Sequence, residues 1–308
     1  MSALPAAVEL GLIYAVMALG VYLTFRILNF PDLTVDGSFT TGAATAAVLI
    51  TGGTHPALAT LAAGAAGLGA GVITGLLHAK GGINPLLAGI LTQIGLYSIN
   101  LRIMGGANVP LLREDTLITP LRENGLLGGA AAIGIFAAIA LLVKLALDWF
   151  LHTDTGLALQ ATGDNEAMIR SFGVNTDRTK ILGLAVSNGL VGLAGAGVAQ
   201  YQGFADISMG IGLIIAGLAS VILGQAVFGS RVIVISTLAV VLGSILYRVV
   251  IQLALQVPWL EANDMKLVSA VLVVTALLLP RWGVFRRVGA LRSLRRTAAT
   301  TTTPAGGQ

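Results

Sequence analysis

The stretch TDTGLALQATGDNEAMIRSFGVNTDRTK, residues 153–180, is a polar interruption between two long apolar segments. Its apolar residues recur at the spacing of an amphipathic helix, and they are Leu157, Ala161, Ala167, Met168 and Phe172. Gly163 interrupts this pattern and permits a bend, and Asp164 or Asn165 can cap a new helical turn. Gly173 is typical of the residue that ends a helix. We therefore predict two short helices, each with one face against the protein and one face exposed.

The rest of the chain has the composition of a membrane protein. Of the 308 residues, 56% are hydrophobic and 10% are charged, whereas soluble domains carry about 25% charged residues. Several apolar stretches reach the roughly 20 residues that a helix needs to cross a bilayer. The 40 glycines form small-residue stripes that allow close helix packing in lipid, as in Gly67, Gly71 and Gly75 and in Gly212, Ala216, Ser220 and Gly224. We expect an all-α, polytopic helical membrane protein.

Hydropathy predicts nine helices, within a total of about eight to ten, in a single transmembrane domain. They cover residues 8–28, 36–52, 56–78, 83–103, 125–150, 179–200, 210–229, 231–253 and 265–280. The second segment is short and rich in Thr, Gly and Ala, so it is either a buried central helix or a re-entrant one. The domain ends near residue 296, and a low-complexity tail, residues 297–308, is expected to be disordered. The N-terminus lacks the basic region of a cleaved signal peptide.

Charge asymmetry predicts the orientation. With the C-terminus inside and the N-terminus outside, 13 of the 18 basic residues lie on the inner side, in agreement with the positive-inside rule. The inner residues are Arg26, Lys80, Lys144, Arg170, Arg178, Lys180, Arg231 and the six arginines from Arg281 to Arg296, which can also attract anionic lipid. The outer loop, residues 105–124, and the turn at residues 261–266 mix acids and bases. They are either a surface for a soluble partner or plain solvated loops.

The junction NFPDLTVDGSFTTGAA, residues 29–44, places acids between the first two apolar segments. Pro31 ends the first helix. We expect Asp32 at the cytoplasmic end of that helix and Asp36 as the N-cap of the next. Short broken segments line the pathway in transporters, so the second segment is also a candidate for a pore-side helix. The candidate pathway residues are Asn29, Asp32, Thr34, Asp36, Ser38, Thr41, Gln93 and Asn188.

Other polar residues in apolar segments have structural explanations beside functional ones. Gln93 and Asn188 can form interhelical hydrogen bonds or line the pathway. Lys144 and Asp148 are four residues apart, which predicts an ion pair that snorkels to the interface. Arg248 is expected to snorkel too. Tyr201 lies at the outer mouth, where it could contact a receptor or the solute.

The sequence GLALQATGDNEAMIRSFGVNTDRTKILGLAVSNGLVGLAGAGVAQYQGFAD, residues 156–206, resembles the coupling loop and following helix of ABC importer permeases in the branched-chain amino acid permease family. That family has a glycine-punctuated ATG-N-x-x-A loop and then G-[IV]-N. Its opening NF and glycine elements match Asn29, Phe30, Gly37 and residues 42–43. The variants NFPDLTVDGSF and ILGQAVFGSR resemble a subgroup thought to import tryptophan, tyrosine or related molecules. The resemblance covers residues 8–285.

This resemblance implies a type II ABC importer-like fold in the bacterial plasma membrane. Two permease subunits, here expected as a homodimer, would surround a pore above two cytoplasmic ATPase subunits that bind ATP and Mg²⁺. A periplasmic or lipoprotein substrate-binding protein would deliver the solute. The polar face of residues 153–178 would dock on the ATPase through Gln160, Gly163, Asp164, Asn165, Glu166, Arg170, Phe172 and Gly173. Gln160 stands where many relatives have a basic residue, so it cannot supply a salt bridge there.

The chain itself lacks the motifs of an enzyme. It contains no G-x4-G-K-[ST] phosphate loop, no GxSxG nucleophile elbow and no paired histidines for a metal site; there is also no cysteine. We expect no bound cofactor, no metal, no catalysis and no nucleic-acid partner. The rival classes are an ion-gradient-driven secondary transporter, which would need acids deep in the membrane, and a membrane scaffold. An aromatic or branched-chain amino acid is the expected solute, with nucleosides and sugars as alternatives.

Overall fold

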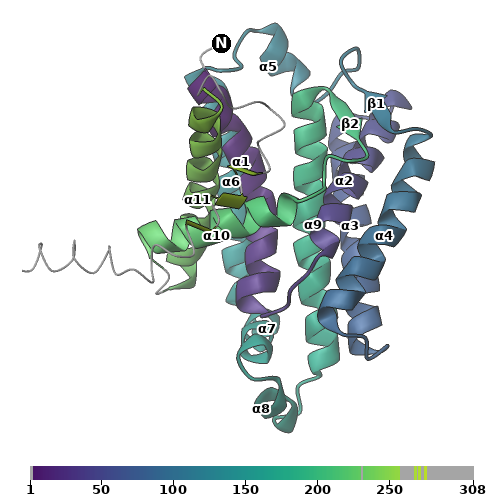
Figure 1. The fold of residues 1–308 in the computed structure, drawn as a ribbon, viewed down its shortest axis with the longest axis vertical. Coiled ribbons are helices and arrows are strands. Elements are labelled where there is room, and N and C mark those ends of the chain that lie inside the picture. The colour runs from purple at the N-terminus through teal and green to yellow at the C-terminus, as the bar shows by residue number, and fades with distance from the viewer. Residues whose placement is uncertain (1–2, 230–231, 257–266, 269, 272–273, 276–308) are drawn as a thin grey trace, which may run out of the picture.

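The computed structural model describes residues 3–229, 232–256, 267–268, 270–271 and 274–275. These residues form a bundle of long helices with short elements at both ends (Figure 1). In chain order the elements are α1 Ala3–Tyr22, the π-helix η1 Leu23–Ile27, α2 Thr34–Thr51, α3 Pro56–Ala79, α4 Pro85–Met104, β1 Asn108–Pro110, α5 Thr119–Glu123, α6 Ala130–Leu151, α7 Asp154–Asp164, α8 Glu166–Ser171, α9 Thr176–Gln202, β2 Phe204–Asp206, α10 Leu213–Phe228 and α11 Ile233–Ala254.

Eight of the nine helices predicted from hydropathy are confirmed, with boundaries that differ by a few residues. The ninth, residues 265–280, lies largely outside the described residues, as do the turn at residues 261–266, Arg231, the arginines from 281 to 296 and the tail. Six helices in the described ranges are long and apolar enough to span a membrane: α1 with η1, α3, α4, α6, α9 and α11. The predicted all-α, polytopic class is therefore confirmed, with β1 and β2 as a small antiparallel addition.

Two of the predicted segments differ from the spanning helices. Almost every residue of α2 from Thr34 to Ala47 is buried, so α2 is the buried central helix that was one of the two alternatives. α10 is shorter than a full span, and it runs across the bundle while α1 and α9 run along it (Figure 1). α5 and the β1–β2 sheet lie at one end of the molecule, and α7 and α8 lie at the other (Figure 1).

α9 is the centre of the bundle and packs against α3, α2 and α1. The predicted glycine stripe on α3 makes the closest of these contacts possible. A Cβ on Gly67 or Gly71 would collide with the backbone carbonyl of Asn188 or Leu184 on α9. The second stripe is only partly a packing device, because Gly224 meets α11 closely but Gly212 has a φ of 84° and precedes α10 as its N-cap.

The chain breaks between α1 and α2 and turns toward the interior of the bundle. η1 ends at Ile27, and Asn29 takes a positive φ of 53°, the one such non-glycine residue in the described ranges. The backbone then passes Pro31 and starts α2 at Thr34. Asp32 contacts Asn188, near the middle of α9. The expectation that Asp32 lies at the cytoplasmic end of the first helix is therefore wrong, because the chain after η1 turns back into the bundle.

Candidate functional site

Asp32 links the segment between η1 and α2 to α9. One carboxylate oxygen accepts a hydrogen bond from the Thr34 backbone amide at 2.9 Å, and the other accepts from the Asn188 side chain at 2.7 Å. Both side chains are buried. A buried carboxylate is stable only with such donors, so this pair holds the start of α2 against α9. For Asn188, this is an interhelical hydrogen bond of the kind given as one of its two alternatives.

Three threonine hydroxyls extend this polar region across α2, α3 and α4. Thr34 lies 2.7 Å from Thr74, and Thr74 donates to Thr92 at 2.9 Å. Thr92 in turn donates to the Ala88 carbonyl on its own helix at 3.0 Å. Thr34 is therefore occupied in holding three helices together.

Asp36 caps a different helix from the one predicted. It lies within the first turn of α2, whose N-cap is Leu33 without a side-chain cap. Its two carboxylate oxygens accept from the backbone amides of Gly212 at 2.7 Å and Ile214 at 2.8 Å. These amides begin α10, where the helix dipole favours a negative charge. Asp36 thus caps α10, and the expectation that it caps its own helix is wrong.

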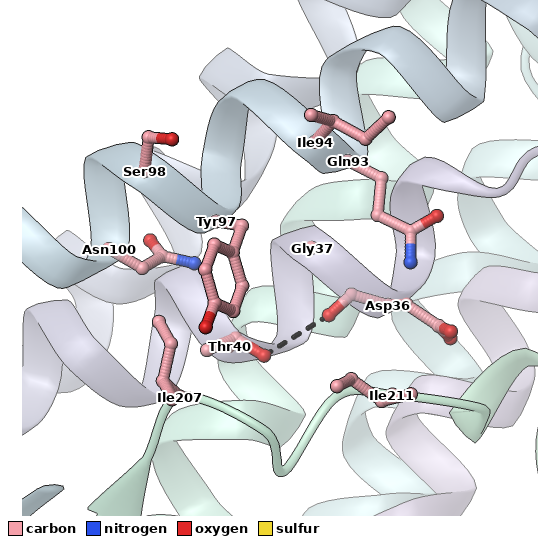
Figure 2. A pocket seen from close by; sticks show the side chains of 10 residues that line it. All are labelled: Asp36, Gly37, Thr40, Gln93, Ile94, Tyr97, Ser98, Asn100, Ile207 and Ile211. Carbon is pink, nitrogen blue, oxygen red and sulfur yellow. Dashed lines mark hydrogen bonds between the residues drawn. The ribbon is translucent and has the colours of Figure 1, made fainter. Parts of the chain in front are cut away.

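A cavity of about 390 Å³ lies beside Asp36, between α2, α4 and the segment that joins β2 to α10. We call it the α4 cavity. Figure 2 shows side chains from all three segments around it. Its lining consists of Asp36, Gly37, Thr40, Gln93, Ile94, Tyr97, Ser98, Asn100, Ile207 and Ile211. It combines amide, hydroxyl and carboxylate groups with an apolar wall.

Only two of the candidate pathway residues, Asp36 and Gln93, line the α4 cavity. Asn29 lines a separate cavity of about 650 Å³ between η1, α7 and α11. Ser38 is buried, and the Thr41 hydroxyl donates to the Gly37 carbonyl within α2. The candidate pathway residues therefore do not form one site. Some pack between helices, Asp36 caps α10, and others line one of the two cavities.

Sequence reasoning missed Tyr97 and Asn100, although the signal was present. Gln93, Tyr97 and Asn100 are spaced i, i+4 and i+7, which places them on one face of a helix. A polar stripe on an apolar spanning helix faces protein or water in preference to lipid. Thr40, one turn after Asp36 on α2, completes the polar wall opposite.

The two predicted short helices are α7 and α8, but the bend between them lies elsewhere. Asn165 has extended backbone angles, and its side chain accepts from the Met168 amide at 3.0 Å to cap α8. Gly163 is still helical and packs against the backbone at Ile27, where a Cβ would collide with the carbonyl oxygen. The bend therefore lies at Asn165, and the role predicted for Gly163 as the hinge is wrong. Gly173 follows the end of α8 with a φ of 86°, which agrees with its predicted role as the residue that ends a helix.

A cluster of charges fixes α8 on the start of α9. Glu166 forms salt bridges with Arg170, four residues later on α8, at 3.0 Å and with Lys180 at 2.7 Å. Arg170 also donates to the Thr176 hydroxyl at 2.8 Å. The hydrogen bond and charge of Lys180 lower the pKa of Glu166 below its ordinary value of 4.5, helped by Thr176 and Arg170.

His78 continues this cluster to the break after α1. The Lys180 ammonium lies 3.3 Å from the His78 ring nitrogen Nε2, and the His78 ring meets the Phe30 ring edge-on with centroids 5.1 Å apart. Phe30 lies between Asn29 and Pro31 in the broken segment. Contacts therefore run without interruption from α8 through Lys180 and His78 to the junction that Asp32 anchors.

The exposed side of the α7–α8 pair carries large apolar side chains. Phe172 is 75% exposed, and Leu157 and Met168 are also exposed. Gln160 points the other way, because its amide donates to the Leu151 carbonyl at 2.7 Å. The carboxylate of Asp164 borders the cavity that Asn29 lines.

The remaining polar predictions have mixed outcomes. Lys144 and Asp148 form the predicted ion pair at 2.5 Å, but the side chains are 5% and 9% exposed, so the pair does not snorkel. Arg248 does not snorkel either, since its guanidinium lies 3.6 Å from the Tyr14 ring centre. The Tyr201 hydroxyl donates to buried Glu9 at 2.7 Å. The described residues contain no group of three metal-ligating side chains.

Comparison with known proteins identifies the family. A family model described as the branched-chain amino acid transport system, permease component, matches residues 6–277. The chain belongs to this family. The resemblance of the loop and junction motifs is thereby confirmed, and the permease is a transport subunit.

Several curated permeases are similar to this one. The tyrosine transport system permease protein of Clostridioides difficile (strain R20291) is 42% identical over 90% of this chain and 91% of that protein. The autoinducer 2 import system permease protein LsrC of Yersinia pseudotuberculosis serotype O:1b (strain IP 31758) is 30% identical over 69% of this chain and 59% of that protein. The ribose import permease protein RbsC of Escherichia coli (strain K12) is 26% identical over 74% and 72%. No solved structure matches the permease significantly.

Proposed function

We propose that this permease is the membrane subunit of an ATP-driven importer for an amino acid, with tyrosine and related aromatic amino acids first. The observation that carries the proposal is the α7–α8 pair, which stands outside the bundle with exposed apolar side chains and a charged cluster at its base. A short, capped helix pair of this kind suits a groove on a soluble motor. The 42% identity to a tyrosine transport permease supports the solute class.

ATP and Mg²⁺ belong to the partner ATPase in this proposal, and this chain binds no cofactor. ATPase closure would push on α8, and the contacts through Lys180 and His78 would carry that movement to the junction after α1. The α7–α8 end is then cytoplasmic, together with the C-terminus, and the N-terminus is outside. The β1–β2 end would receive solute from a periplasmic or lipoprotein receptor. We propose a homodimer in the bacterial plasma membrane.

A permease of the same class for a sugar is the second candidate, because the ribose and autoinducer 2 relatives match at 26% and 30% identity. An ion-gradient-driven transporter is the rival mechanism. The two junction acids are engaged in hydrogen bonds, Asp32 with Asn188 and Asp36 with the start of α10, which favours an anchoring role for both over ion coupling.

The experiment is uptake of labelled L-tyrosine, L-leucine or D-ribose into proteoliposomes that hold the permease with its ATPase and receptor. We expect L-tyrosine uptake that requires ATP and receptor. Uptake by the permease alone on a proton or sodium gradient would contradict the mechanism, and uptake of D-ribose alone would contradict the solute class.

Two matched variants test the docking surface. Phe172 on the loop and Trp149 on α6 are exposed to nearly the same extent, 75% and 73%. Truncating an aromatic side chain at the centre of an interface costs about 2 kcal/mol or more, which is more than about tenfold in affinity. We expect Phe172→Ala to lower uptake and receptor-stimulated ATP hydrolysis together, and Trp149→Ala to leave both near normal. Full coupled uptake by the Phe172→Ala protein would show that the loop is not the docking element.

A further inference from the structure

We propose that the α4 cavity is a binding site that the transported solute occupies on its way through the permease, and that Asn100 selects a solute with an aromatic hydroxyl group. The proposal rests on the amino acid importer function proposed above and assigns the site and the selecting residue. It starts from the side chain of Asn100, whose buried amide has no hydrogen-bond partner among the described residues.

Asn100 is 1% exposed, and neither its amide nitrogen nor its amide oxygen has a hydrogen-bond partner among the described residues. Leaving a buried amide unpaired costs free energy, so native structures pair nearly all such groups. Two other buried polar side chains near the cavity follow this rule, since Thr40 donates to the Asp36 carbonyl and Thr92 to the Ala88 carbonyl. A solute in the cavity would supply the partner that Asn100 lacks.

The cavity has two polar ends joined by an apolar wall. In Figure 2, Gln93 and Asp36 lie at one end, with the Gln93 amide nitrogen pointing toward Asp36. Asn100 lies at the other end, and its amide nitrogen points toward Tyr97 (Figure 2). Between them the walls are formed by the Tyr97 ring and by three isoleucines, Ile94, Ile207 and Ile211. The ligand that fits is polar at both ends and flat or apolar in the middle.

The charge of the cavity lining further restricts which solutes can bind. Among the described residues, Asp36 is the one charged residue in the lining of the cavity, and no described lysine, arginine or histidine accompanies it there. A solute with net negative charge would therefore find no counter-ion. The Asp36 oxygens each accept one backbone amide, and a carboxylate oxygen can accept more than one hydrogen bond, so a solute ammonium can still bind.

An L-amino acid with a phenolic ring satisfies these constraints. Its ammonium bonds Asp36, its carboxylate accepts from the Gln93 amide, and its ring lies against Tyr97 and the isoleucines. Its hydroxyl then reaches the Asn100 amide. A buried group that pairs with a substrate hydroxyl discriminates strongly against the analogue without it, because that group is then left unpaired.

The first test compares L-tyrosine with L-phenylalanine in the reconstituted complex, with the receptor saturated by each solute so that receptor affinity does not enter. We expect Asn100→Leu to lower the ratio of tyrosine to phenylalanine uptake by about tenfold or more. The matched control is Thr92→Val on the same helix, because Thr92 is buried but partnered by Thr74. This control should keep the native ratio. An unchanged ratio in the Asn100→Leu protein overturns the proposal.

The second test does not measure uptake, and it does not depend on whether the Asn100→Leu variant folds. The chain has no cysteine, so a single introduced thiol is labelled uniquely by a hydrophilic thiol reagent. Ile94→Cys and Ile211→Cys place it on opposite walls of the α4 cavity, and Arg113→Cys places it on the exposed loop outside the cavity. In the permease–ATPase complex without receptor, L-tyrosine should protect both wall positions and leave Arg113→Cys labelled.

The outcomes separate this site from the proposed function. If L-tyrosine protects neither wall position while ATP-driven tyrosine uptake is intact, the site is wrong and the function stands. If L-tyrosine protects both walls but ATP drives no uptake, the function is wrong and the site stands. Protection by D-ribose and not by L-tyrosine overturns the assignment of the ligand.

Discussion

Single glycines set how closely α3 approaches α9. Gly67 and Gly69 are two residues apart on α3, but a Cβ on Gly67 would collide with the Asn188 carbonyl, whereas a Cβ on Gly69 meets nothing within 4 Å. We expect Gly67→Ala to destabilise the permease by about 1–3 kcal/mol through overpacking. Gly69→Ala should be neutral or stabilising, since alanine favours helix. Thermal unfolding of the purified variants in detergent measures both, and equal losses of stability would contradict the packing role of the stripe.

A second prediction at the scale of single residues concerns the buried ion pair between Lys144 and Asp148. Asp148 also accepts from the Thr237 hydroxyl at 2.6 Å. Removing one partner of a buried ion pair costs about 3–5 kcal/mol, while replacing both by apolar residues is often neutral. Asp148→Asn should therefore lower the unfolding temperature much more than the double change Lys144→Met with Asp148→Leu. A double variant that is less stable than Asp148→Asn would contradict this account.

At the scale of elements, α8 depends on the charge of Glu166. Because contact with Lys180 holds the pKa of Glu166 below 4.5, the stabilisation is fully present above the ordinary pKa and is lost as pH falls through the lowered value. Hydrogen exchange of the α8 amides should therefore stay slow from neutral pH down to about 4.5, after correction for the intrinsic exchange rate, and should become faster only below that. Glu166→Gln should show fast exchange already at neutral pH.

The matched control is Asp177→Asn, since the ion pair of Asp177 with Arg170 is longer, at 3.5 Å. Its α8 exchange should remain close to that of the native chain at neutral pH. Loss of protection above pH 5 in the native permease would show that the Lys180 contact does not hold the carboxylate charged.

The sequence predicted the helices well and their partners poorly. Hydropathy located α1 to α4, α6 and α9 to α11, and local signals located the caps at Asn165 and Gly173. The depth of Asp32 and the capping of α10 by Asp36 were missed, because both depend on contacts with residues more than 150 positions away. β1 and β2 were also missed, since three-residue strands carry no periodic pattern.

The candidate site was predicted in the same uneven way. Gln93 and the junction stood out because they are polar in apolar surroundings. The α4 cavity exists only once the segment after β2 folds over α2 and α4, so local patterns could not assign Ile207 and Ile211 to it. Gly163 was misread as a hinge for a related reason, because the backbone that it touches at Ile27 is distant in sequence.

At the scale of the whole molecule, the described part of one chain leaves polar side chains of α4 exposed. Tyr97 is 47% exposed and Ser98 is exposed beside it, although α4 is one of the apolar helices long enough to span a membrane. Lipid chains cannot satisfy such groups. A second copy related by two-fold symmetry would place the same face opposite itself and would enclose the α4 cavities of both subunits beside a shared route.

The absence of cysteine makes this arrangement directly testable. Two copies that carry different tags and the single change Ser98→Cys should form mixed-tag cross-links in the assembled complex, because a two-fold axis near this face brings the same residue together from both copies. The control is Leu142→Cys on α6, which is 68% exposed on a surface that lipid can cover, and it should give no cross-link. Recovery of a different permease chain with the tagged copy, without mixed-tag pairs, would contradict the homodimer. Cross-linking through Leu142→Cys alone would place the interface on α6 and leave the polar face of α4 without the partner proposed for it.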